Sequence, residues 1–414
     1  MYLKNDSSKA LLSRRPFLLF LLSQGISNLG ESFRFIAVTM MLFKLTGSGV
    51  SAALGLMLAA IPSIVFSPFA GTIGDMFSEK YLLAAIDLIR GAAVLLYITN
   101  KNVTAIYLML VFMSALEMLY SPSRRKIMVS IAGKKGVLHA NSLMTGFSGA
   151  AFIAGPIIAG ILTDIYGPDP AFIINSLTYL SSSILILFIK KDSSNMTTRP
   201  GTEGRNRKFF NELVKGYDYF KKDPPIKEIV LTSVIVSFNM IAINMAFYPY
   251  AFDVLGVTSK SWSMMISIYY GTNLLAMVLM AFIPGKTASS AWRAIYGGFA
   301  VTALIWMFYG FTQSYPLVLL LQFIEGTVLA ICGILLSTRI QSISEKGFLA
   351  RIGGINDILG SLGRLAGMGC AYIVISLGSY RNVFLVNSLM LLLFSLYKLS
   401  SGKTSIRISQ KSVT

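Results

Sequence analysis

The sequence predicts an all-α membrane protein with twelve transmembrane helices in two pseudo-symmetric six-helix halves. Of the 414 residues, 54% are hydrophobic and only 13% are charged, which is more apolar sequence than a soluble core needs. Twelve stretches are long and apolar enough to cross a bilayer, for which a helix needs about 20 residues. Short sequence fragments also recur between the two halves of the chain.

The twelve predicted spans are joined by short polar segments and by one long one. They cover residues 17–43, 50–73, 81–99, 103–120, 141–163, 171–189, 228–252, 262–284, 294–312, 316–338, 355–377 and 382–399. Segments on one side of the membrane carry 29 of the 36 Lys and Arg residues, and those on the other side carry 4. Because basic residues are retained in the cytoplasm, this predicts a multi-pass protein of the cell membrane with both termini cytoplasmic.

The recurring fragments are separated by an offset of 211 or 212 residues. Phe172-Ile-Ile-Asn-Ser-Leu matches Phe384-Leu-Val-Asn-Ser-Leu, and Asn28 matches Asn239. Matches at one offset and at corresponding spans predict a duplication that produced two six-span halves.

Three domains follow from this duplication. They are an N-terminal half at 1–189, a linker at 190–227, and a C-terminal half with a cytoplasmic tail at 228–414. The linker is polar and basic, and it carries an apolar stripe from Phe209 to Phe220 flanked by lysines. This pattern predicts an amphipathic helix that lies on the anionic membrane surface or packs on cytoplasmic loops.

The fifth predicted span has a face of small residues around a central proline. Gly149, Gly155 and Gly160 allow another backbone to approach closely, while Pro156 removes a backbone donor and bends the helix. We expect this helix to act as a pivot, with Gly155 and Pro156 facing the other half and controlling closure. Ordinary tight packing is the alternative.

Charged side chains within the predicted spans are few, and a charge inside a bilayer costs about 2.5 to 3.5 kcal/mol. They are Glu31 and Arg34 in the first span, Asp87 and Arg90 in the third, Glu117 in the fourth, Glu325 in the tenth, and Asp357 and Arg364 in the eleventh. Helical spacing places Ser27 and Asn28 on the same face as Glu31, so this face is expected to line a cavity or contact another helix.

Some of these charges are interpreted as structural. Asp87 with Arg90, and Asp357 with its neighbours, are expected to form ion pairs that lock helices together, since a paired buried charge is tolerated where a lone one is not. We also expect Glu325 to pair with Arg364, because the tenth and eleventh spans are neighbours in the sequence.

The remaining carboxylates are candidates for proton exchange. Glu31 and Glu325 lie near the middle of their spans. There, burial favours the neutral form of the carboxyl, whereas a nearby arginine favours its charged form. Arg34 lies one turn from Glu31. If Arg34 keeps the Glu31 carboxylate ionised in both states of the protein, Glu31 cannot exchange protons. Glu117 is the third candidate.

One motif in the fifth span resembles a family signature. Ala151-x-x-x-Gly155-Pro156-x-x-Ala159-Gly160 resembles the Gly-x-x-x-Gly-Pro-x-x-Gly-Gly pattern of major facilitator antiporters, with alanine replacing two glycines. The resemblance implies the major facilitator fold and alternating access around a midplane site.

A second motif, between the second and third spans, resembles the cytoplasmic loop signature of the same superfamily, Gly-x-x-x-Asp-Arg-x-Gly-Arg-Lys. It begins at Gly71 and contains Gly74, Asp75 and Lys80. Asp75 and Lys80 match the signature, whereas Met, Ser and Glu replace its two arginines and one glycine. The resemblance implies a gating role for this loop, with a weakened charge relay.

Further fragments are similar to the drug:proton antiporter branch that includes macrolide-efflux proteins, and more distantly to siderophore exporters and lysophospholipid transporters. These fragments are Gln24-x-Ile-Ser-x-Leu-Gly-Glu31, Asp87-Leu-Ile-Arg90, Ala140-Asn-Ser-Leu and Gly216-Tyr-Asp-Tyr-Phe-Lys-Lys-Asp-Pro.

The sequence lacks the motifs that are typical of several other functional classes. His139 is the only histidine, so a zinc site would lack partners. A phosphate loop and a nucleophile motif are absent from the sequence, so we expect neither an enzyme nor an ATP-driven pump, and no cofactor or metal. The net charge of +18 lies mainly in predicted cytoplasmic segments and does not indicate nucleic acid as a partner.

We therefore expect a proton-coupled secondary active transporter that exports a lipophilic small molecule or drug, as in multidrug efflux. Its expected partners are the substrate, protons and the lipid bilayer, and it is expected to function as a monomer. A siderophore or lysophospholipid transporter is the alternative substrate hypothesis. A non-transporting membrane sensor or scaffold is the alternative from another class.

Overall fold

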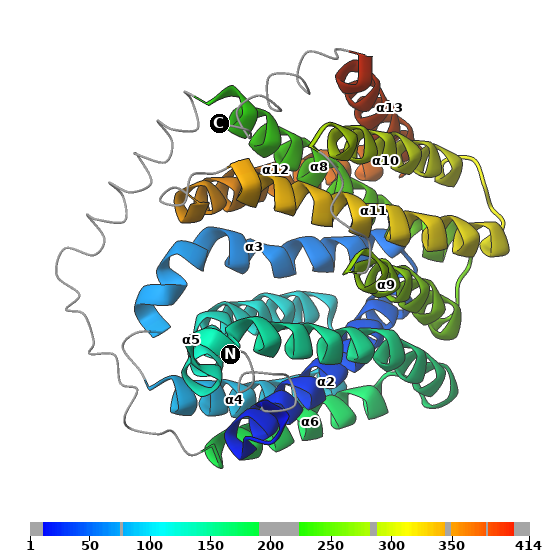
Figure 1. The fold of residues 1–414 in the computed structure, drawn as a ribbon. Coiled ribbons are helices and arrows are strands. Elements are labelled where there is room, and N and C mark those ends of the chain that lie inside the picture. Colours follow the sequence, from blue (N-terminus) through cyan, green and yellow to red (C-terminus); the bar gives the residue numbers. More distant parts are fainter. Residues whose placement is uncertain are drawn as a thin grey trace. The chain divides into compact units, whose positions relative to one another are not determined.

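The first half of the chain forms five long helices in a computed structural model (Figure 1). The structure describes residues 11–74, 78–189, 223–281, 288–343, 349–377 and 380–400. The helices are α2 (Arg15–Thr46), α3 (Gly49–Gly74), α4 (Glu79–Thr99), α5 (Val103–Tyr166) and α6 (Asp169–Leu187). Within α5, Gly133 has φ 71° and ψ 160°, a conformation that glycine adopts without a Cβ penalty. This residue divides α5 into the fourth and fifth predicted spans.

The second half also consists of helices (Figure 1). They are α8 (Pro224–Pro249), which continues into the π-helical turn η2 (Tyr250–Val254), α9 (Ser259–Ala281), α10 (Ala288–Tyr309), α11 (Tyr315–Ile343), α12 (Leu349–Ser376) and α13 (Tyr380–Ser400). Each predicted span coincides with one helix or with one part of α5. The predicted twelve-helix fold is therefore confirmed.

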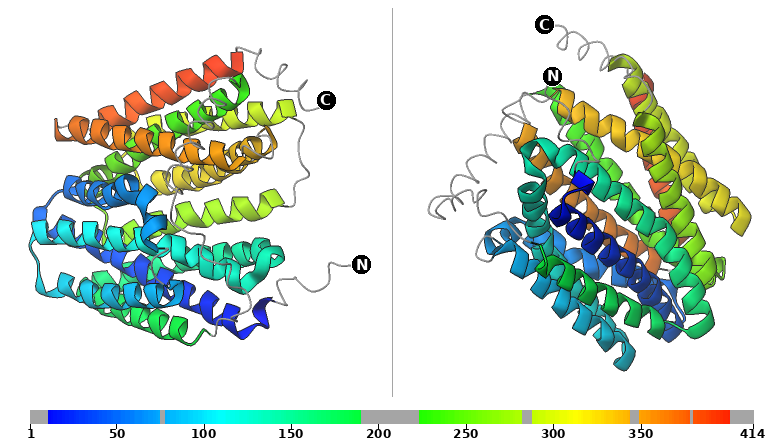
Figure 2. Two further views of the ribbon diagram at one scale, coloured as in Figure 1. Left: turned by 90° about the vertical axis from the view of Figure 1, so that its left-hand side faces the viewer. Right: turned by 60° about the horizontal axis from the view of Figure 1, so that its bottom comes forward.

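The chain divides into two compact units, and the first contains α2 to α6 together with residues 251–271. In this unit α2 packs against α5 and α6, and α4 packs against α6 (Figure 2). Its largest apolar core joins Phe17 and Phe20 of α2, Leu83 of α4, Tyr120 of α5 and Ile186 of α6. Burial of these side chains fixes the rotation of each helix about its axis, and so determines which polar residues face inward.

The second unit contains residues 223–250 and the described residues from 272 onward. Here α8 packs against α12, and α10 packs against α11 and α13. Aromatic side chains fill one end of this unit, where the rings of Phe247, Tyr250, Tyr309 and Phe384 lie 5.3 to 6.2 Å apart. The predicted domain division stays a prediction, and most of its linker, residues 190–222, lies outside the described residues.

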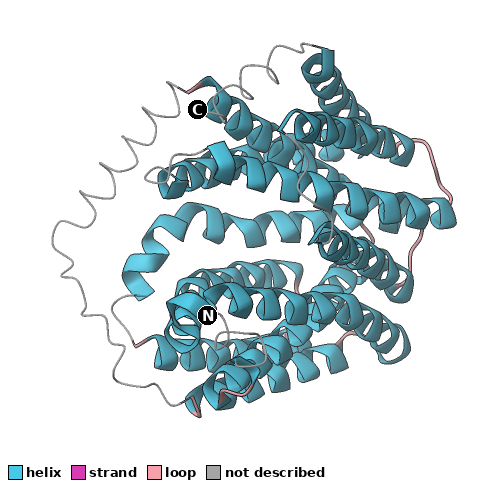
Figure 3. Ribbon diagram, viewed as in Figure 1, coloured by secondary structure: helices cyan, strands magenta, loops and turns pink. Residues whose placement is uncertain are grey.

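Helix is the only regular secondary structure in the described ranges (Figure 3). Nine of the helical segments there are long and apolar enough to cross a membrane by length and composition. Helix α2 is not among the nine, because polar residues such as Gln24, Asn28 and Glu31 lower its mean hydropathy. Those same residues line the candidate site.

Candidate functional site

A cavity of about 500 Å³ lies within the first unit. Its polar lining consists of Gln24, Ser27, Asn28, Glu31, Ser32, Arg34, Arg90, Ser114, Glu117, Tyr120 and Arg124, and its apolar lining consists of Phe35, Ala59, Leu110, Met113, Phe152, Pro156, Ile266 and Tyr270. Charged groups therefore share one chamber with aromatic and aliphatic surface. A cavity of this size and character suits a small molecule with both polar and apolar parts.

Helix α2 supplies much of the polar wall because its polar residues recur every three or four positions. The predicted stripe of Ser27, Asn28, Glu31 and Arg34 lines the cavity as one face. Asn28 Nδ2 donates to Ser148 Oγ of α5 at 2.7 Å, which ties this face to the neighbouring helix.

Glu31 has two partners in the structure. Its carboxylate accepts from Arg34, one turn along α2, and from the hydroxyl of Tyr179 on α6. The side chains of Glu31 and Arg34 are 26% and 17% exposed, so the pair is partly open to the cavity. Glu31 is thus both accessible and held by a cation.

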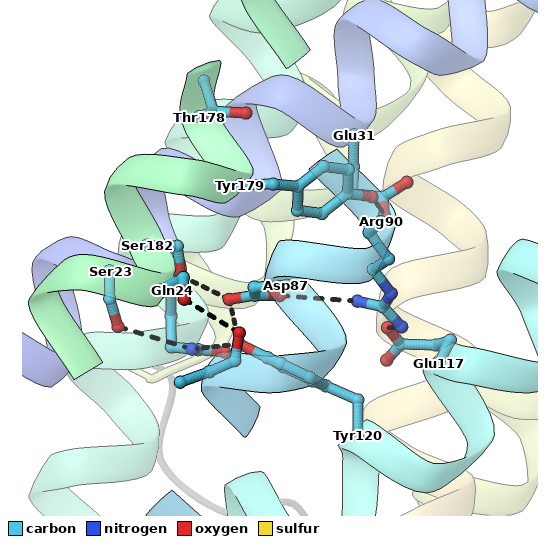
Figure 4. Close-up of polar contacts among 12 residues, drawn as sticks. Ser23, Gln24, Glu31, Asp87, Arg90, Glu117, Tyr120, Thr178, Tyr179 and Ser182 are labelled. Carbon is cyan, nitrogen blue, oxygen red and sulfur yellow. Dashed lines mark hydrogen bonds and ion pairs between the residues drawn. The ribbon is translucent and has the colours of Figure 1, made fainter. Parts of the chain in front are cut away.

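The central feature of the site is Arg90, which lies between two carboxylates (Figure 4). Its Nη2 is 2.7 Å from Glu117 Oε2, and its Nη1 is 3.9 Å from Asp87 Oδ1. The guanidinium lies over the ring of Tyr120 at 4.8 Å and that of Tyr179 at 5.8 Å. Two of the predicted sites, the Asp87 and Arg90 pair and the Glu117 carboxylate, therefore form one cluster.

Asp87 is fully buried behind this cluster, where hydroxyl groups hold it. Its Oδ2 accepts from Ser182 at 2.6 Å and from Tyr120 at 3.2 Å, and Gln24 donates to the Tyr120 hydroxyl at 2.7 Å (Figure 4). Asp87 Oδ1 has no hydrogen-bond partner within the described part of the chain.

Sequence reasoning missed the contributions of Tyr120 and of α6. Asn175, Tyr179 and Ser182 recur at helical spacing on the buried face of α6. Asn175 donates to the carbonyl of Gly30, and the other two reach Glu31 and Asp87. The sequence feature that could have revealed these residues is the helical spacing of polar side chains inside the sixth span.

In the second unit, the structure corrects the predicted pairing of Glu325 with Arg364. Glu325 is 7% exposed and accepts from Trp306 Nε1 at 2.7 Å and from the Tyr309 hydroxyl at 2.8 Å. Arg364 donates to Ser361 at 2.7 Å. The pairing fails because sequence neighbours need not share a face: α11 packs mainly on α10, whereas α12 packs mainly on α8.

Two other charges of the second unit differ in their surroundings. Asp357 is exposed on α12, and it forms no ion pair with another described residue. Glu228, which sequence reasoning overlooked, accepts from Lys398 at 2.9 Å and from Tyr296 at 3.0 Å. The ion pair of Glu228 links α8 with α13.

The fifth predicted span contacts its own half as well as α9. A Cβ on Gly155 would lie 2.6 Å from Ser32 Cβ on α2, so Gly155 packs closely against its own half. The predicted contact of Gly155 with the other half stays a prediction. The helical rotation that brings Pro156 to the cavity wall turns Gly155 toward α2. A Cβ on Gly160 would lie 2.6 Å from Ser263 Cβ on α9. Gly149 lies in the same helix, and the gating role of these residues stays a prediction.

The predicted cytoplasmic loop motif lies partly outside the described residues. Gly71 and Gly74 are in the last turn of α3, and Lys80 is in the first turn of α4, with its Nζ 5.7 Å from the centre of the Tyr81 ring. Asp75 is not among the described residues. In the described part of the chain, no three His, Cys, Asp or Glu residues lie together as a metal site would require.

Comparison with known proteins identifies a family and several relatives. The model of the Major Facilitator Superfamily matches residues 20–368. The class B tetracycline resistance protein of Escherichia coli is 26% identical over 293 residues, 64% of this chain and 65% of that protein. The multi-drug resistance efflux pump PmrA of Streptococcus pneumoniae is 22% identical over 372 residues, 87% of this chain and 88% of that one.

A further relative and a solved structure extend the comparison. The lysophospholipid transporter LplT of Pectobacterium carotovorum is 23% identical over 330 residues, 72% of this chain and 75% of that protein. The crystal structure of the nucleoside transporter NupG superposes with a TM-score of 0.72 at 12% identity, covering 94% of this chain and 99% of that one. The chain spans between 54% and 65% of the length of the first curated relatives that it matches.

Proposed function

Because the chain belongs to the Major Facilitator Superfamily, we propose that it exports lipophilic small molecules across the cell membrane in exchange for protons. The family and the solved neighbours are transporters, so the chain is a multi-pass membrane transport protein and not an enzyme. The proposal adds the driving ion, the direction and the substrate class.

The cavity in the first unit is the observation that carries this proposal. Its volume of about 500 Å³ lies within the range of roughly 300 to 1,000 Å³ that is usual for small-molecule sites. Phe35, Phe152 and Tyr270 supply aromatic surface for the apolar body of a substrate, and Glu31 brings a carboxylate into the same chamber. Two relatives with efflux or resistance in their names support export as the direction.

Glu31 is the carboxylate to which we assign proton coupling. A coupling group must exchange protons with water and must change its surroundings between the two states of the transporter. Glu31 has the required access, and its contact with Tyr179 of α6 changes when α2 moves relative to α6. A proton crossing ~100 mV releases about 2.3 kcal/mol, enough for a roughly fortyfold substrate gradient at 1.4 kcal/mol per tenfold.

The test compares Glu31→Gln with the wild-type chain in proteoliposomes. Substrate flux is measured with a fluorescent lipophilic amine, with and without an imposed pH gradient. The variant keeps the size of the side chain but is permanently neutral, so we expect downhill flux to remain and the acceleration by the pH gradient to disappear. Asp169→Asn, which alters a carboxylate outside the cavity, is the control and should behave as wild type.

Glu325→Gln is the second arm of this experiment. Among the described residues, the donors to Glu325 are the neutral groups of Trp306 and Tyr309. A buried carboxyl without a cation avoids the cost of an uncompensated charge when it is protonated. If Glu31→Gln retains full pH-driven flux and Glu325→Gln loses it, the coupling assignment moves to Glu325. If wild-type protein shows no gradient-driven flux, the transport proposal fails and the sensor or scaffold hypothesis gains support.

A lysophospholipid is the second candidate substrate. The relative LplT is named as a lysophospholipid transporter, and the mixed polar and apolar lining of the cavity suits an amphiphile. Fluorescent lysophospholipid is tested in the same vesicles to distinguish the two substrates. If lysophospholipid is the substrate, it should show gradient-driven flux and the amine should not.

A further inference from the structure

The two carboxylates on either side of Arg90 differ in their access to the cavity. Glu117 lines the cavity and its side chain is 50% exposed, whereas Asp87 is 0% exposed and does not line it. Arg90 itself is only 2% exposed. The arginine, which lies between the two carboxylates in Figure 4, therefore joins a carboxylate that a ligand can reach to one that a ligand cannot reach.

Asp87 has unused capacity to accept a hydrogen bond. Both of its hydroxyl donors, Ser182 and Tyr120, contact Oδ2, while the buried Oδ1 has no hydrogen-bond partner in the described part of the chain. Buried polar atoms are nearly always satisfied, so an open acceptor in this position requires a reason. Arg90 Nη1 is 3.9 Å from Oδ1, and a movement of about 1 Å would bring it to the usual hydrogen-bond distance.

The surroundings of Arg90 allow this movement. The rings of Tyr120 and Tyr179 lie 4.8 and 5.8 Å from the guanidinium carbon and offer cation-binding faces. A shift of this size leaves the guanidinium over these faces. Arg90 can thus exchange one carboxylate for the other without passing through an unpaired state.

We propose that Glu117 binds the cationic group of the substrate and that Arg90 transfers from Glu117 to Asp87 when the substrate arrives. This inference rests on the proposed function and adds the substrate class, a cationic amphiphile. Without Asp87, release of Glu117 would leave Arg90 as a lone buried cation, which is the costly state of a buried ion pair. With Asp87 in place, Arg90 is paired with Asp87 and the cationic group of the substrate is paired with Glu117.

The charge balance of the cavity agrees with a cationic ligand. Glu31 and Arg34 neutralise each other, and after the transfer Arg90 is neutralised by Asp87. Glu117 and Arg124 then remain as one carboxylate and one cation, since Arg124 has no ion pair among the described residues. A ligand that brings one positive charge to Glu117 therefore does not enter a chamber of net positive charge.

The test uses two organic ions of nearly the same shape and opposite charge, tetraphenylphosphonium and tetraphenylborate. Equilibrium binding of each radiolabelled ion is measured on the purified full-length chain in lipid nanodiscs, without any gradient. We expect Glu117→Gln to weaken phosphonium binding at least tenfold and to leave borate binding unchanged or stronger. Glu117→Asp keeps the charge and should lie between Glu117→Gln and wild type.

Asp87→Asn tests the transfer, because Asp87 does not line the cavity. Arg90 would then stay on Glu117, so phosphonium binding should weaken at least fivefold while borate binding is kept. Borate binding also reports that each variant is folded, and Asp169→Asn is the matched control that should change neither ion.

Three results would overturn the inference. Wild-type phosphonium affinity in Glu117→Gln would remove Glu117 from recognition, and wild-type affinity in Asp87→Asn would remove the transfer. Equal weakening of both ions would mean that these residues only maintain the cavity. Because binding is measured without a gradient, failure here leaves proton-driven export to its own test, and failure of export leaves cation recognition intact.

Discussion

At the scale of single residues, steric fit decides the role of Gly155. A Cβ at this position would lie 2.6 Å from Ser32 Cβ, and a side chain cannot rotate its own Cβ away. Gly155→Leu should therefore destabilise the packing of α5 on α2 by about 1 to 3 kcal/mol, as overpacking does, and should lower the thermal unfolding midpoint in detergent. Gly146→Leu is the control on the same helix, because a Cβ there would meet nothing within 4 Å. If both variants unfold at the same temperature, Gly155 is not at a close contact.

At the scale of secondary-structure elements, one helix end is held by a neighbouring helix. Asp164, near the end of α5, accepts from the backbone nitrogens of Ser259 and Lys260 at 2.9 Å each, so it caps the first turn of α9. Asp164→Ala should cost about 1 kcal/mol, a typical loss for a helix cap, and should speed amide exchange in that turn about fivefold. Asp169→Ala, whose partner Lys101 is exposed and 3.5 Å away, should have little effect. Unchanged exchange in Asp164→Ala would contradict the capping role.

At the scale of the whole molecule, the distribution of basic residues predicts orientation. An excess of 29 to 4 Lys and Arg residues places both termini in the cytoplasm. A green fluorescent protein fused after Thr414 should therefore fluoresce, and alkaline phosphatase fused there should be inactive. Phosphatase inserted at Lys101, between α4 and α5, should be active, since the opposite side is predicted for that loop. Active phosphatase at Thr414 would contradict the predicted orientation.

The sequence by itself determined the number, length and order of the helices, because bilayer thickness sets the length of an apolar span. It also identified the α2 stripe with Glu31, since helical periodicity places residues three and four apart on one face. Only the tertiary structure decided which side chains meet between helices. Arg90 contacts Glu117, 27 residues away, and Glu325 contacts Trp306 and Tyr309 instead of Arg364. The physical reason is that partners across helices depend on the rotation of each helix about its axis, which is set by packing of the whole unit and not by the local pattern.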